Sequence, residues 1–322
     1  MISRRYLRIK VMQALYARQA DPSEEIVLGE KNLDKSIAQC QTLSYCFFSI
    51  LPEIKRYLEN KFEDRKGKIF PTQEDLNPNT RFIDNQVIIQ MENSSEFNRE
   101  WSRLPIDWSQ HKELIISLFA QIEAMPEYQA YMAAETTNYK TDKQLVLDIF
   151  EKVFAPSEIL QWFFEEQSAH WLDDYNDALL QVYQGVVFWK AGTEDVKAAP
   201  LFKDKEEDTF FYKKLYRKTI EHDQECQELI EDKLKNWESD RIIATDMILM
   251  KMAVCEMMEF PSIPVKVTIN EYIEIAKVYG SEKSGTFING IVDRIAQELR
   301  ETGRLNKQGR GLLNESLNIT ER

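Results

Sequence analysis

The C-terminal third of the chain places apolar residues at steps of three and four, and this spacing constrains the fold more than any other feature. Within residues 240–259 the step runs through Ile243, Met247, Met250, Val254 and Met257. Such spacing puts these side chains on one buried face of a helix, whose start Asp240 can cap. Two prolines, Pro261 and Pro264, then force an extended connection.

Two further helices are predicted after this connection. Thr268 and Glu271 form a T-x-x-E capping box for a helix that ends at Gly280, a position typical of left-handed backbone. The last helix runs from about 284 to 302 and stops at Gly303. Its apolar stripe steps evenly by four through Phe287, Ile291, Ile295 and Leu299. Three consecutive helices with short connections predict an antiparallel bundle.

The same residues resemble a known family. The run Ile263 to Ile295, IPVKVTINEYIEIAKVYGSEKSGTFINGIVDRI, resembles the signature of the NusB family of bacterial transcription antitermination factors. The preceding DRIIATDMILMKMAVCEMM is similar to the family's penultimate core helix, and SRRYLRIKVMQALY within residues 1–17 to its arginine-rich first helix. The resemblance covers roughly residues 1–20 and 205–302. It implies an all-α fold, a NusB-like antiparallel helical bundle.

The middle of the chain has no counterpart in this resemblance. Helical patterns over 32–62 and 108–190, separated by a loop at 64–82, predict a second helical lobe, with a break at Pro52. Residues 192–208 are expected to be a linker. The predicted domains are the first helix (1–20), an acidic helical insertion lobe (21–200), the C-terminal bundle (201–303) and a flexible basic tail (304–322).

Charge is distributed unevenly along the chain. There are 41 basic and 54 acidic residues, a net charge of −13. Residues 1–20 carry a net +5 without a single acid, residues 21–200 a net −14, and residues 201–322 a net −4. An acidic protein repels nucleic acid overall, so any nucleic-acid site has to be a local basic patch. The first helix is the candidate.

Arg4, Arg5 and Arg8 occupy the first two turns of the first helix. Cations at this end oppose the helix dipole, and a bound phosphate would reverse that cost. The alternative is that they are solvated cations at an exposed terminus. The resemblance implies the RNA role: family members bind single-stranded boxA RNA of ribosomal RNA leaders together with NusE, a small-subunit ribosomal protein, in the transcription elongation complex.

Further site residues follow from the resemblance. Lys283 and Phe287 are expected on the same RNA-facing side, where Phe287 either begins the core stripe or offers its ring to a base. Tyr16 and Asp246 are expected toward NusE, although Asp246 can equally be a solvated residue of its helix. Structural roles are expected for Asn270, Glu271, Lys277 and the pair Asn289-Gly290, the last as a site of close helix packing.

No enzymatic site is expected. The three histidines stand in no metal or nucleophile motif, there is no glycine-rich phosphate loop, and the four cysteines form no CxxC pair. We therefore expect no cofactor and no metal. A fusion to a ribosomal RNA methyltransferase would need an α/β domain after the signature, where only about 20 residues remain. Without a signal peptide or a membrane-length apolar run, a cytoplasmic protein is expected; Lys251 and Glu256 interrupt the run at 247–258.

Two hypotheses for function follow. The first is an RNA-binding transcription antitermination factor that acts in ribosomal RNA transcription with NusE. The second is a helical protein-interaction scaffold whose acidic insertion binds a basic partner, with RNA binding secondary or lost. The charge of the insertion is also explained by solubility alone. Whether the chain forms a homodimer is left open.

Overall fold

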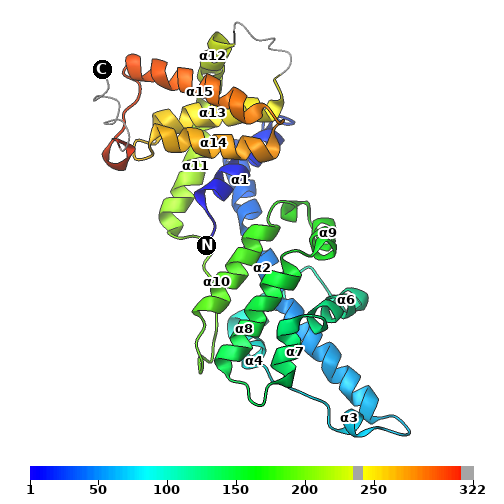
Figure 1. Ribbon diagram of the computed structural model, residues 1–322. Helices are drawn as coiled ribbons and strands as arrows, with labels where there is room; N and C mark the ends of the chain where they lie inside the picture. Colours follow the sequence, from blue (N-terminus) through cyan, green and yellow to red (C-terminus); the bar gives the residue numbers. More distant parts are fainter. Residues whose placement is uncertain (235–241, 313–322) are drawn as a thin grey trace. The chain divides into compact units, whose positions relative to one another are not determined.

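The computed structural model describes residues 1–234 and 242–312, and these residues form helices α1 to α15 with no strand among them (Figure 1). The predicted all-α fold class is confirmed. The chain divides into two compact units. Unit 1 consists of Met1–Ile2 and Ala38–Lys203, and unit 2 of Ser3–Ile37 with the described residues from Asp204 onward. Unit 2 thus also contains residues 21–37, which the sequence analysis assigned to the insertion.

Unit 2 is a helical bundle around a central helix. Its elements are α1 (Arg4–Arg18), the start of α2 (Ile26–Lys66), α11 (Lys205–Glu221), α12 (Asp223–Lys233), α13 (Ala244–Glu259), α14 (Val265–Tyr279), α15 (Ser284–Glu301) and a 3-10 turn at Gly309–Leu312. Helix α13 contacts α1, α11, α12, α14 and α15. Residues on every side of α13 are therefore buried, where the sequence predicted a single buried face.

Helices α13 and α14 begin at other residues than the sequence suggested. Asp240, the predicted cap, lies outside the described residues, and α13 begins at Ala244. The predicted capping box of Thr268 and Glu271 is wrong, because α14 already begins at Val265, directly after Pro264. Proline has a fixed φ suited to a helix start, so the connection leads into the helix one turn earlier than predicted.

The glycines of unit 2 act differently from prediction. Gly280 has φ −102°, so the predicted left-handed conformation is wrong. Glycine is required there by close approach, since a Cβ atom would lie 2.5 Å from the Ser284 Cβ atom and 2.7 Å from the Ala276 carbonyl oxygen. A Cβ atom on Gly290 would meet no described atom within 4 Å, so the predicted close packing at Asn289-Gly290 is wrong. Gly303, just past α15, has φ 69°.

The segment after α15 packs on the bundle as far as it is described. Lys307 Nζ donates to the carbonyl oxygen of Phe260 at 3.0 Å, and the Gln308 amide donates to that of Pro261 at 3.0 Å. Lys307 is 8% exposed. A cation at the C-terminal end of α13 is favoured by the helix dipole. Residues 307 and 308 thus contact the end of α13, within the segment predicted as a flexible tail, and residues 313–322 of that tail lie outside the described residues.

Unit 1 is a separate helical assembly. It contains the remainder of α2, then α3 (Gln73–Leu76), α4 (Gln86–Asn93), α5 (Ser95–Trp101), α6 (Lys112–Glu123), α7 (Pro126–Ala133), α8 (Tyr139–Ile149), α9 (Glu158–Gln167) and α10 (Tyr175–Phe188). Its core is aromatic, with edge-to-face ring pairs such as Phe47 with Phe164 and Phe48 with Phe97.

Two boundaries in and beside unit 1 differ from prediction. Helix α2 continues through Pro52 without a break, because its neighbours Leu51 and Ile54 are fully buried and packing holds the helix despite one lost backbone hydrogen bond. The predicted linker ends earlier than residue 208. Asp204 caps α11 by accepting hydrogen bonds from the amides of Glu206 and Glu207, so the helix begins at Lys205.

Candidate functional site

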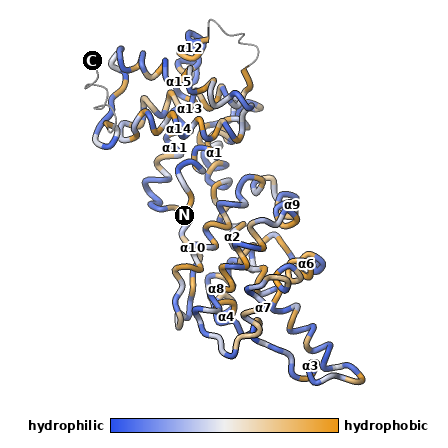
Figure 2. The backbone as a smooth tube through the Cα atoms, viewed as in Figure 1, coloured by the Kyte–Doolittle hydropathy of each residue, from blue (hydrophilic) through white to orange (hydrophobic). Residues whose placement is uncertain are grey.

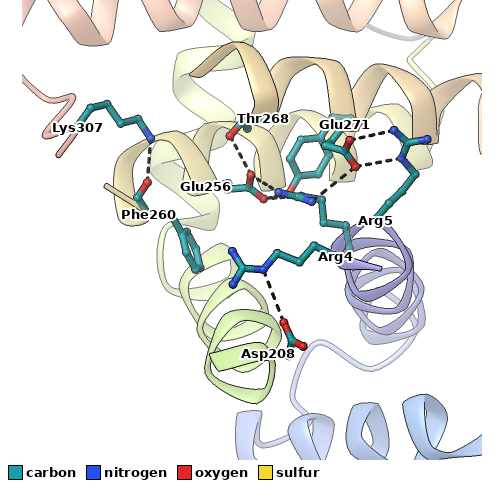
Figure 3. Close-up of polar contacts among 10 residues, drawn as sticks. Arg4, Arg5, Asp208, Glu256, Phe260, Thr268, Glu271 and Lys307 are labelled. Carbon is teal, nitrogen blue, oxygen red and sulfur yellow. Dashed lines mark hydrogen bonds and ion pairs between the residues drawn. The ribbon is translucent and has the colours of Figure 1, made fainter. Parts of the chain in front are cut away.

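The N-terminal end of α1 is the basic edge of unit 2. The Ser3 hydroxyl accepts a hydrogen bond from the Tyr6 amide at 3.1 Å and caps the helix. No acid occupies the first turn, which instead carries Arg4 and Arg5. The three predicted arginines, Arg8 included, have different partners. Figure 3 shows Arg4 directed toward Asp208 and Arg5 toward Glu271.

Arg8 is buried in an ion pair with α13. Its side chain is 3% exposed, and its Nε and Nη2 atoms donate to Glu256 Oε2 and Oε1 at 2.8 and 2.7 Å. Burial lowers the pKa of Arg8, but the Glu256 carboxylate more than offsets this, so the pKa is raised above its ordinary value. With so little of its side chain exposed, Arg8 does not belong to the surface that a phosphate can reach, contrary to the prediction.

Helix α14 completes the environment of Glu256. The carboxylate accepts from Thr268 Oγ1 at 2.8 Å and from the Tyr272 hydroxyl at 3.1 Å, while being fully buried itself. Burial and the neighbouring Glu256 charge raise the pKa of Tyr272 well above its ordinary value, so this hydroxyl stays a donor. A single buried carboxylate thereby joins α1, α13 and α14.

Arg5 lies at the surface and pairs with α14. Its Nε and Nη2 atoms donate to Glu271 at 3.0 and 2.9 Å, and 44% of its side chain is exposed. The hydrogen bonds to Glu271 raise the pKa of Arg5. An exposed pair of this kind contributes about 0 to 1 kcal/mol, so Arg5 can exchange its carboxylate for a phosphate at little cost.

Arg4 faces α11. It donates to Glu207, and its Nε atom lies 3.7 Å from Asp208 Oδ1. The guanidinium carbon is 5.1 Å from the centre of the Phe211 ring, which is within range of a cation–π contact. With 36% of its side chain exposed, Arg4 shares the accessible edge of α1 with Arg5.

The start of α15 carries the other predicted RNA-facing residues. Lys283 precedes the helix and is exposed. Phe287 is half-buried, whereas its neighbour Ile288 and the following Ile291 are buried. The core stripe therefore begins at Ile288, and the Phe287 side chain keeps part of its surface accessible.

The two predicted partner-facing residues differ in accessibility. Tyr16 on α1 is 55% exposed. Asp246 in the first turn of α13 is 5% exposed, and its Oδ2 atom accepts from Ser284 Oγ at 2.7 Å. Its Oδ1 atom is buried and has no hydrogen-bond partner among the described residues. Burial raises the pKa of Asp246 above its ordinary value.

Sequence reasoning missed the group that holds α1 in place. Thr268 and Glu271 were expected to form a capping box; instead Glu271 binds Arg5 and Thr268 donates to Glu256. No role was assigned to Glu256 or Tyr272. One signal was present: Glu256 interrupts an otherwise apolar helical run. A carboxylate at a core position requires a buried cation, and Arg8 is that cation.

The described residues give no sign of other chemistry at these positions. Among them, no group of three or more His, Cys, Asp or Glu side chains could hold a metal ion. All four cysteines are buried, and none of them forms a disulfide with another. No described helix is both long enough and apolar enough to cross a membrane.

Comparison with known proteins locates the similarity. The sequence profile of the NusB family matches residues 178–297. Three proteins, each named transcription antitermination protein NusB, are similar to parts of the chain. The protein of Salinibacter ruber is 47% identical over 103 residues, or 32% of this chain and 64% of that protein. The Chloroherpeton thalassium protein is 40% identical over 120 residues, or 37% of this chain and 54% of that protein. The Exiguobacterium protein is 38% identical over 95 residues, or 30% of this chain and 74% of that protein.

The range matched by the NusB family profile differs from the range of the predicted resemblance. It begins within α10, upstream of the predicted start at about 205, and does not include the first helix. The chain spans 64% and 54% of the length of the first two relatives. No solved structure matches the chain.

Proposed function

The chain belongs to the NusB family, and from this premise we propose that it acts in transcription antitermination by binding RNA through the start of α1 and the start of α15. The similar proteins of three bacteria, all named for antitermination, support the process. The observation that carries the RNA-binding part is the pair Arg4 and Arg5. Both are accessible in a first turn without acids, at the end of α1 that favours anions.

The exposed groups fit a single-stranded RNA. Arg4, Arg5 and Lys283 supply cations for phosphates, and Phe287 supplies partly accessible ring surface for a base. The carboxylates of Glu207 and Glu271 bind the two arginines until a phosphate replaces them. We propose boxA-type RNA in ribosomal RNA transcription as the ligand. Arg8 contributes indirectly, by fixing α1 to α13.

The ribosomal protein NusE is the proposed protein partner, within the transcription elongation complex. Tyr16 offers an exposed aromatic ring on α1. Asp246 is buried, with its Oδ1 atom unused by any described residue, so its proposed contribution is to hold the start of α15 and not to contact the partner directly. Asp246 accepts a hydrogen bond from Ser284 and so positions the helix that carries Phe287.

Equilibrium binding of a labelled boxA-type RNA tests the proposal. A scrambled RNA of the same composition is the control, and both are measured with and without NusE at several salt concentrations. We expect sequence-selective binding that strengthens with NusE and weakens with salt. Absence of selectivity under every condition, while NusE still binds, would contradict the RNA-binding role and favour the scaffold hypothesis.

A further inference from the structure

Helix α9 of unit 1 exposes a tryptophan and an isoleucine on one side. Trp162 is 62% exposed, and Ile159, which stands three residues earlier and therefore beside it on the helix surface, is 56% exposed. Figure 2 shows α9 with both hydrophobic and hydrophilic residues along its length. Tryptophan is enriched among the residues that contribute most of the binding energy at protein interfaces. An exposed tryptophan next to an exposed isoleucine is therefore a candidate contact surface.

The remaining neighbours of Trp162 on this surface are acids. Glu158 stands four residues before Trp162, and Glu165 and Glu166 stand three and four residues after it. Residues at these spacings are neighbours on a helix, so the three carboxylates surround the tryptophan. We call Glu158, Ile159, Trp162, Glu165 and Glu166 the α9 face. It combines an apolar centre with an acidic surround.

The chain supplies few cations near the α9 face. Residues 153–189 contain six acids and neither lysine nor arginine. Lys152, just before this segment, is bound to other acids, with its Nζ atom 2.6 Å from Glu127 and 3.4 Å from Asp148. The start of α6 contacts α9 through the rings of His111 and Phe163, and Lys112, the next residue, is the cation that this contact adds. Acids thus outnumber cations around α9.

The C-terminal end of α9 strengthens the demand for a cation. Glu165 and Glu166 lie in its last turn, which contains no basic residue. Negative charges at this end oppose the helix dipole, whereas a cation placed there is favoured. A positively charged partner would therefore offset both the repulsion between the carboxylates and their unfavourable interaction with the dipole.

The opposite side of α9 is fixed to the core of unit 1. Phe164 is fully buried, and its ring packs edge-to-face on Phe47 at a centroid distance of 4.9 Å. The Phe163 ring stacks on Trp108 at 5.6 Å, and the Ser157 hydroxyl caps the start of the helix. The α9 face is therefore held by packing beneath it. A surface that is already ordered loses little entropy when it binds.

We propose that the α9 face binds a basic protein segment, one that places an apolar side chain against Trp162 and Ile159 and lysines or arginines against the three glutamates. Complementary charge steers such an encounter and fixes its register. The same carboxylates would repel the phosphates of a nucleic acid or of an anionic lipid. A second copy related by two-fold symmetry would set these acids against one another. This proposal does not depend on RNA binding by unit 2.

Fluorescence anisotropy of a labelled peptide with the full chain tests the proposal. The probe is an amphipathic peptide of lysine and leucine, and the control peptide carries glutamate in place of each lysine. The wild type should bind the lysine peptide and not the glutamate peptide. The dissociation constant should rise by at least about tenfold in Trp162→Ala, which keeps the net charge, and in Glu158→Gln/Glu165→Gln/Glu166→Gln, which keeps the apolar centre.

Two variants serve as matched controls. Glu123→Gln/Glu135→Gln/Glu194→Gln removes three exposed acids elsewhere in unit 1 and changes the net charge equally. Phe70→Ala removes an aromatic ring that is exposed outside the α9 face. Both should bind the lysine peptide as the wild type does. Circular dichroism checks that every variant is folded.

Several results would overturn the proposal. One is a wild type that does not bind the lysine peptide, and another is Trp162→Ala binding as tightly as the wild type. An equal loss of affinity in the variant that lacks the three acids elsewhere would show attraction to the overall charge of unit 1 and not to the α9 face. Sedimentation equilibrium is measured in parallel, because a dimer that Trp162→Ala abolishes would assign the face to a second copy instead.

Discussion

Replacement of Arg8 by methionine should destabilise unit 2 far more than the same replacement of Arg5. Arg8→Met keeps most of the side-chain volume but leaves Glu256, which is fully buried, without its cation. Thr268 and Tyr272 still donate to that carboxylate, but they are neutral. Removing one partner of a buried ion pair costs about 3 to 5 kcal/mol. Arg5→Met breaks a surface pair and should cost about 0 to 1 kcal/mol.

Hydrogen exchange measured by mass spectrometry suits this comparison. It reports the free energy of opening at α13 and α14 separately from any unfolding of unit 1, where a single global transition would mix the two units. The double variant Arg8→Met/Glu256→Met should cost less than the sum of the single variants, because it leaves no unpaired buried charge. If Arg8→Met lowered the opening free energy no more than Arg5→Met, the reasoning from the buried pair would be refuted.

Further predictions concern backbone packing, pH and RNA affinity. Gly280→Ala should destabilise unit 2 by about 1 to 3 kcal/mol, because the added Cβ atom would clash with the Ala276 carbonyl oxygen. Gly290→Ala should stabilise unit 2 by about 0.5 to 1 kcal/mol, because the added Cβ atom would have open space. Thermal melting of the two variants tests both expectations. Burial raises the pKa of Asp246, so the wild type should lose stability as the pH rises from the ordinary aspartate pKa through the raised value. The variant Asp246→Asn should not show this loss. Thermal melting at a series of pH values from acidic to neutral tests the difference. Glu271→Gln should tighten RNA binding by removing an acid that competes for Arg5, as RNA titrations would show; unchanged or weaker binding would contradict this.

Much of unit 2 could be predicted from local patterns. The final helix, predicted over 284–302, is α15 (Ser284–Glu301), because its stripe of isoleucines and its closing glycine are local signals. The start of α14 was predicted one turn too late, because the capping-box pattern of Thr268 and Glu271 placed the start at Thr268, whereas the helix begins directly after Pro264. The central position of α13 was not predictable from one helix, since it depends on five neighbouring helices.

The site was predictable in part. The arginine cluster was located, but which arginine is buried depends on contacts separated by more than 240 residues along the chain. Spacing within α1 does not contain that information. Asp246 shows the same limitation, because its burial depends on Ser284 of another helix. The segment between α2 and α3 was predicted only as part of a loop, since turn-forming residues predict a loop but not what its apolar side chains contact.

The central claim is that Arg4 and Arg5 place the RNA on the start of α1. The most direct measurement is the salt dependence of boxA-type RNA binding for the wild type, for Arg4→Gln/Arg5→Gln, and for Arg99→Gln/Arg103→Gln, a control pair of exposed arginines in unit 1. A single-stranded RNA loses a slope of about 0.7 per phosphate contact, so the α1 variant should bind more weakly with a slope lower by about 1.4, while the control matches the wild type. An α1 variant with wild-type affinity and slope would contradict the account.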